Sequence, residues 1–138
     1  QVIDFLAGFS SCGAHTCSIQ LAVYNWNGAA FENTLDGSSV DLPNPKVEVR
    51  PRGGAPAIWV TGQGIGSVGA GVQRSITRIW VFSAQSGRWE IAAEEKSAAV
   101  YRIHALQDAE YYFHDGQLER ALPFFERIAI NQPPYQDF

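Results

Sequence analysis

The spacing of apolar residues changes once along this chain, at about Arg102. Before that point apolar residues recur at every second position or form short runs, a pattern typical of β-strands. After it they recur at every third or fourth position, which indicates helix. The pattern therefore predicts an α+β protein that is mainly β, with strands near 2–8, 18–26, 30–35, 46–52, 57–62, 75–83 and 88–95.

The predicted strands bury either one face or both. Val47 and Val49 alternate with charged neighbours, so their strand should have one covered face and one wet face. The runs IQLAVYNW (19–26) and ITRIWVF (76–82) carry large side chains on both faces, which favours central positions in a sheet. Antiparallel pairing is indicated by tight-turn sequences between strands: Asn27-Gly28, Gly53-Gly54 and Ser86-Gly87.

The helical part should form two antiparallel helices. The break at 114–116 contains Gly116, which can end the first helix, and Asp115 or Gly116 is expected to cap the second. Pro123 removes a helical hydrogen bond. It predicts a kink, or a second helix that becomes regular only from Pro123. The apolar stripe of the second helix is the better formed: Leu118, Ala121, Leu122, Phe125, Ile128 and Ala129.

Residues 2–36 and 57–95 share one order of features: strand, glycine-rich loop, strand, turn and aromatic strand. Repetition of this kind indicates a modular β architecture. We expect an antiparallel β domain over 1–96, built of two related units that resemble propeller blades or form a small sandwich. Residues 97–138 should form a helical hairpin that packs on this domain or follows it.

Composition limits the classes of partner. The 138 residues suit one ordinary domain or two very small ones, and the net charge of −4 is spread evenly, which disfavours nucleic acid. No apolar run reaches the roughly 18 residues that cross a bilayer, so no transmembrane segment is predicted in this chain. The chain has no methionine and opens on Gln1, which suggests a processed product or an excised piece.

Two cysteines, Cys12 and Cys17, lie in one loop with four residues between them. This spacing matches neither a zinc knuckle nor a thioredoxin-like motif. A disulfide across the loop is the preferred interpretation, and two reduced thiols are the alternative. Such a bond suits an oxidising compartment. It favours an extracytoplasmic protein that is secreted, periplasmic or surface-anchored, for example as a lipoprotein.

Motifs for catalysis, metals and cofactors are weak. Residues 64–69 match G-x-G-x-x-G but precede a strand instead of a helix, so a glycine hairpin is favoured over a phosphate site. His104 and Asp108 stand four apart without a visible third ligand, and we expect a solvated pair or one bonded to the sheet. No metal, cofactor or catalytic residue is predicted. The candidate ligand-binding residues are His15, Gly64, Gly66 and Ser67.

Several aromatic residues fall in the predicted strands. Strand aromatics are usually core, and a sugar-stacking platform is the less favoured interpretation. They are Trp26, Trp59, Trp80, Phe82 and Trp89.

Within the helical region 102–133, the segment HALQDAEYYFHDGQLERALPFFERIAINQP resembles a single tetratricopeptide repeat. The resemblance depends on Tyr112, Gly116, Ala121, Phe125 and Pro133. Pro123 and Ile128 depart from the family pattern. Such repeats form arrays that bind peptides, and one repeat cannot build the usual groove. The resemblance implies a cap on the β part or the first unit of an array.

Residues 1–96 resemble a pair of FG-GAP or VCBS-type repeats, on the segments AVYNWNGAAF and RIWVFSAQSGRW. The resemblance implies blades of an extracellular β-propeller, although two copies are too few to close one. Family members bind calcium through alternating aspartates. The equivalent stretch here, residues 51–56, has no carboxylate, so calcium binding is not expected.

We therefore expect a non-enzymatic, extracytoplasmic interaction or scaffold module of a larger bacterial protein, with an unidentified protein partner. Exposed β edges also make a homodimer plausible. The first alternative is a carbohydrate or small-ligand module using loops 9–17 and 62–73. The second is a hydrolase in which His104 or His15 meets a carboxylate in a deep pocket.

Overall fold

The computed structural model describes residues 4–13, 17–35, 39–40, 42–63, 72–130 and 135–136. The chain divides into two compact units, which we call the β unit (Gln1–Ile65 with Ser75–Lys96) and the helical unit (Gly66–Arg74 with Ser97–Phe138). The β unit contains β1 (Asp4–Cys12), β2 (Cys17–Trp26), β3 (Phe31–Asn33), β4 (Ser39–Val40), β5 (Lys46–Arg52), β6 (Ala55–Gln63), β7 (Ser75–Ser83) and β8 (Arg88–Lys96). The helical unit contains α1 (Arg102–His114) and α2 (Leu118–Ile130).

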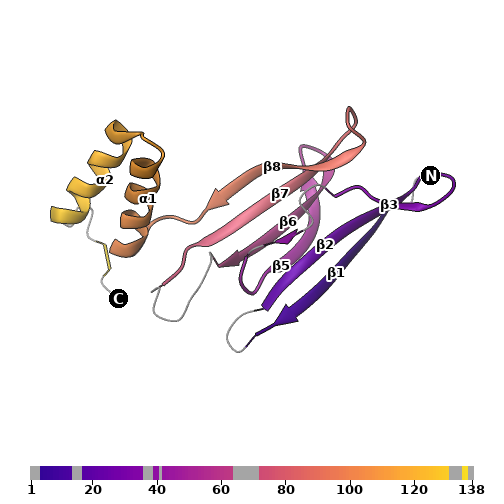
Figure 1. Cartoon of the computed structure of the whole chain (residues 1–138), viewed down its shortest axis with the longest axis horizontal. Coiled ribbons are helices and arrows are strands. Elements are labelled where there is room, and N and C mark those ends of the chain that lie inside the picture. The colour runs from indigo at the N-terminus through magenta and orange to yellow at the C-terminus, as the bar shows by residue number, and fades with distance from the viewer. Residues whose placement is uncertain are drawn as a thin grey trace. The chain divides into compact units, whose positions relative to one another are not determined.

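The strands form two antiparallel four-stranded sheets (Figure 1). The first has the order β1-β2-β3, with β4 also paired to β2, and the second has the order β5-β6-β7-β8. The α+β, mainly β class is thus confirmed, and β2 and β7 are central strands as predicted. The short strand β4 was not predicted.

One hydrophobic core joins the two sheets into a sandwich. Its buried side chains come from β2, β6 and β7, with additions from the connecting segments and β8: Leu21, Val23, Leu35, Leu42, Ile58, Val60, Trp80 and Trp89. The sheets also meet through the backbone, because Trp89 N donates to Thr34 O at 2.8 Å. Each sheet contains a three-strand meander, β1–β3 and β6–β8, although a duplication of sequence remains a prediction.

The chain passes from the first sheet to the second through a proline-containing connection, residues 42–45. Leu42 lies in the core, and Gln63 N donates to Pro43 O at 3.2 Å. A Cβ atom on Gly62 would lie 2.8 Å from Pro43 O and 2.9 Å from Leu42 Cβ. Glycine is therefore required where the connection crosses β6.

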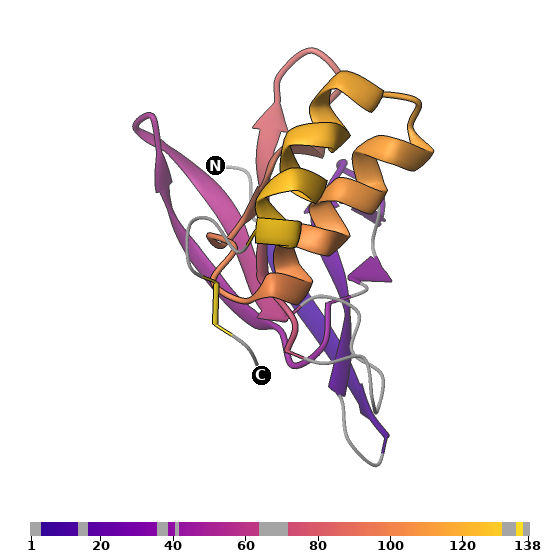
Figure 2. The same cartoon turned by 90° about the vertical axis from the view of Figure 1, so that its left-hand side faces the viewer.

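In the helical unit, α1 and α2 lie side by side and run in opposite directions (Figures 1 and 2). Three small residues are buried in this unit: Ala105, Ala109 and Ala121. Small side chains let the two backbones approach closely. Tyr112 and Phe124 stack at a centroid distance of 5.7 Å and fill the space beside them.

The turn between the helices follows a well-known hydrogen-bond pattern. Gly116 has a φ of +73°, Gly116 N donates to Phe113 O, and Gln117 N donates to Tyr112 O. These two bonds form a Schellman motif, which explains why glycine ends α1 as predicted.

The predicted cap of α2 was wrong. The Gln117 carbonyl, and not a group of Asp115 or Gly116, accepts the first helical bonds, from Arg120 N and Ala121 N. The prediction that the second helix becomes regular only from Pro123 was also wrong, since α2 is helical from Leu118. The missing N–H of Pro123 removes only the bond to Glu119 O in the exposed first turn.

Candidate functional sites

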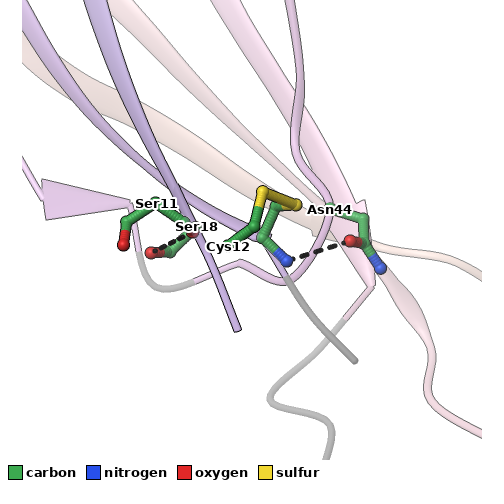
Figure 3. The surroundings of a disulfide bond; sticks show 5 residues. Ser11, Cys12, Ser18 and Asn44 are labelled. Atoms are coloured by element: carbon green, nitrogen blue, oxygen red, sulfur yellow. Dashed lines mark hydrogen bonds between the residues drawn. A yellow bond between two sulfur atoms is a disulfide. The ribbon is translucent and has the colours of Figure 1, made fainter. Parts of the chain in front are cut away.

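The Cys12–Cys17 disulfide closes the hairpin of β1 and β2, as predicted (Figure 3). The two residues are register partners with Cα atoms 4.0 Å apart. On the other side of β2, Cys17 N donates to Asn44 Oδ1 at 3.1 Å, and Asn44 N donates to Cys17 O at 2.7 Å. The cysteine loop is thereby tied to the connection between the sheets.

The sequence-predicted ligand residues His15, Gly64, Gly66 and Ser67 lie outside the described residues. Loops 9–17 and 62–73, in which they fall, are described only in part. Their role as a ligand site stays a prediction.

His104 and Asp108 have different partners in the helical unit, although they share α1. His104 is buried, its Nε2 lies 3.0 Å from Val72 O, and its Nδ1 accepts from Val100 N at 3.4 Å. These partners assign the neutral tautomer with the proton on Nε2. Asp108 pairs with Arg74, whose guanidinium also donates to Ser97 O. The expectation of a solvated pair or of one bonded to the sheet was wrong. His104 binds one backbone acceptor, Val72 O, and one backbone donor, Val100 N–H, and Asp108 pairs with Arg74. These partners lie outside the strands.

The five strand aromatics have different environments. Trp80 and Trp89 belong to the core, whereas about half of the Trp26 and Phe82 side chains is exposed. Trp59 lies under the Arg50 guanidinium, 3.9 Å from the ring centroid. The preferred interpretation as core thus holds for Trp80 and Trp89 only.

Sequence analysis missed an apolar groove on the helical hairpin. The groove has a volume of about 320 Å³, and its walls come from α2 and the end of α1: Phe113, Leu118, Glu119, Ala121, Leu122 and Phe125. Leu118 and Leu122 are each 57% exposed. The sequence predicts the apolar stripe that contains them, but not the groove, because periodicity shows that a helix is amphipathic and not what covers its apolar face.

A second pocket, of about 420 Å³, lies within the β unit. Sheet one contributes Asp4 and Asn25, and sheet two contributes two aromatic rings, Phe82 and Trp89. The remaining lining residues are Ala55, Pro56 and Val81. A signal for it was present in the sequence, since Asp4 and Asn25 place polar groups inside apolar strand runs.

Trp89, which lines this second pocket, also has a buried polar atom. The Trp89 side chain is only 7% exposed, and its Nε1 has no hydrogen-bond partner among the described residues. A buried N–H without a partner costs about 1–3 kcal/mol.

Charged groups elsewhere form simple pairs. The hydrogen bond from Lys46, followed by its charge, lowers the pKa of Glu48 from its ordinary value of 4.5. Within the described ranges, no three His, Cys, Asp or Glu side chains are grouped as metal ligands. None of the helices in the described part of the chain is long and apolar enough to cross a bilayer.

Comparison with protein-family models, curated proteins and solved structures found no match to this chain. The resemblances to FG-GAP or VCBS-type repeats and to a tetratricopeptide repeat therefore remain predictions. Function must be argued from the sites themselves.

Proposed function

We propose that this protein is a non-enzymatic, extracytoplasmic interaction module whose helical hairpin binds a partner polypeptide in the groove of α1 and α2. The observation that carries the proposal is the exposure of large apolar side chains along this groove. Phe113 is 52% exposed beside Leu118 and Leu122. Contiguous apolar surface of this kind marks interaction sites, because covering it with a partner removes it from water.

The charges beside the groove select the kind of partner. Among the described residues that line the groove, Glu119 is the charged one. Glu126 lies two turns further along α2, and Glu110 lies one turn before Phe113 on α1, so both project near the groove. All three are exposed. An acidic rim around an apolar groove complements an amphipathic helix whose apolar stripe is flanked by lysine or arginine.

The basic residue of α2 that follows Glu119 is engaged elsewhere. The Arg120 guanidinium lies over the Tyr112 ring, 4.1 Å from its centroid, and donates to Gln117 Oε1 and the Tyr112 hydroxyl. These contacts hold its charge at the inter-helix turn, so the acidic residues dominate the field at the groove.

The disulfide supports the extracytoplasmic part of the proposal. Disulfides persist in oxidising compartments and are rare in the cytosol. The hydrolase alternative has no such support. Both ring nitrogens of His104 are bonded to backbone groups, so His104 does not form the pair with a carboxylate that this alternative allows. His15, the other histidine of this alternative, lies outside the described residues, and its pairing stays a prediction.

The test uses a labelled amphipathic peptide of leucine and lysine, with a leucine–glutamate peptide of the same pattern as control. Fluorescence anisotropy should show binding of the basic peptide only. Leu118→Ser with Leu122→Ser should weaken binding at least about tenfold, and Glu119→Gln with Glu126→Gln should weaken it and reduce its salt dependence.

Glu95→Gln on β8 is the matched control and should leave affinity unchanged. These substitutions are at exposed positions, so circular dichroism should show folded variants. Equal binding of the acidic peptide, or full binding by the double serine variant, would refute the proposal.

A further inference from the structure

The pocket of the β unit has one polar wall and one aromatic wall. We propose that it binds a small organic cation, an ammonium compound with an apolar body. This site is distinct from the hairpin groove and does not depend on the function proposed for it.

The polar wall comes from strand register in the first sheet. Val23 of β2 is buried in the core opposite Leu6 of β1. Two residues further along β2, and so on the same face, Asn25 is opposite Asp4 on one side and Glu32 of β3 on the other. The apolar inner face of the sheet thus ends in a row of carboxylate, amide and carboxylate.

Hydrogen bonds hold this row in place without neutralising it. Asn25 Nδ2 donates to Asp4 Oδ1 at 2.8 Å, and Asn27 Nδ2 donates to Glu32 Oε1 at 2.5 Å. A carboxylate offers about four acceptor positions, so each retains capacity for a ligand. Both donors are neutral amides, and therefore the negative charge of the row remains.

The aromatic wall comes from the second sheet. Phe82 and Trp89 are register partners with ring centroids 6.0 Å apart and planes inclined by 65°. In this edge-to-face arrangement, the pair of rings offers both a π-face and a hydrocarbon edge to a ligand in the pocket. Aromatic faces attract cations, most strongly from tryptophan, and this attraction grows when the site is shielded from water.

The same groups argue against other ligands. None of the described residues that line the pocket carries a positive charge, so an anion would meet Asp4 without compensation from them. A purely apolar ligand would leave Asp4 and Asn25, which line the pocket, partly desolvated. The volume, about 420 Å³, is that of a small-molecule site.

Choline is the probe, because it is a small quaternary ammonium compound with an apolar surface. Its neutral isostere, 3,3-dimethylbutan-1-ol, has the same shape without the charge. Titrations followed by tryptophan fluorescence and by NMR shifts of the indole N–H groups should show choline binding about tenfold or more tightly than the isostere. The Trp89 indole N–H should be the resonance that moves.

Asp4→Asn should reduce choline affinity about tenfold while leaving the weak binding of the neutral isostere unchanged. Phe82→Leu should weaken both ligands, and more so choline. Phe31→Leu is the matched control, because Phe31 is a half-exposed aromatic that does not line the pocket and contacts Phe5 and Trp26 instead.

Thermal unfolding of each variant establishes that it is folded, and Asp4 and Phe82 are exposed enough for substitution. Equal affinity for choline and the isostere, no binding of either, or an unchanged affinity in Asp4→Asn would each overturn the proposal. Peptide binding by the hairpin should be unaffected by Asp4→Asn, so the two proposals fail separately.

Discussion

Asn44 and Cys17 bind each other through two hydrogen bonds, although they are 27 positions apart in the chain. The Asn44 side-chain oxygen accepts from Cys17 N, and Asn44 N donates to Cys17 O. Asn44 thus binds both the N–H and the carbonyl group of Cys17, at the start of β2. It does so with a φ of +49°, in the left-handed region where asparagine is the most tolerated residue after glycine.

Asn44→Ala should therefore destabilise the β unit by about 2 kcal/mol, because it removes an acceptor and places a Cβ-bearing residue without a local bond at positive φ. Asn44→Gly should recover about half of this loss by relieving the backbone. Urea unfolding of the two variants measures the difference. Equal stability of the two would contradict the backbone part of the explanation.

Removing the disulfide should lower the free energy of unfolding by about 2 kcal/mol, the chain-entropy value for so short a ring. The comparison is between oxidised protein and the Cys12→Ala, Cys17→Ala variant in urea. Thiol titration of the unfolded, unreduced protein should find that neither cysteine reacts. Two reactive thiols would remove the support for an oxidising compartment.

Gly62→Ala should cost about 2 kcal/mol, because the new methyl group meets the backbone of the connection, which must shift. Gly8→Ala on β1 is the matched control. Its methyl group would meet only side-chain atoms, Ile19 Cδ1 at 3.0 Å and Leu21 Cδ2 at 3.4 Å, and should be tolerated better. Comparable destabilisation by both would show that the crossing at Gly62 is not tight.

His104→Leu should destabilise the helical unit by about 2 kcal/mol, since it leaves the Val72 carbonyl and the Val100 N–H without their side-chain partner. His114→Leu, at an exposed position of the same helix, should change stability by no more than about 0.5 kcal/mol. Unfolding followed by far-UV circular dichroism reports on both. A neutral effect of His104→Leu would mean that water replaces the lost bonds.

The Glu48 carboxyl should titrate below its ordinary pKa of 4.5, and Lys46→Ala should raise that pKa. Because the folded-state pKa is lowered, the pair stabilises the fold above the unfolded-state pKa, and this contribution is lost as pH falls through the folded-state pKa. The pair is exposed, so the effect on stability is small. NMR titration of the carboxyl checks the direction, and Lys96→Ala should leave it unchanged.

Local pattern was sufficient for most elements. Apolar side chains on both faces of 19–26 and 76–82 predicted central strands, and β2 and β7 are central. The change of period at Arg102 predicted two helices, which the structure has at 102–114 and 118–130. These predictions succeeded because alternation, helical period and turn glycines are properties of neighbouring residues.

The sites depended on distant residues and were not predicted. Asp4, Asn25 and Glu32 become one row only through the register of three strands. Phe82 and Trp89 line one pocket with Asp4 and Asn25 only because the two sheets share a core. For α2 the sequence by itself determined an apolar stripe, and tertiary structure decided which part of it α1 covers. Periodicity depends on residues a few positions apart, whereas register and packing depend on contacts between segments far apart in the chain, which no local pattern contains.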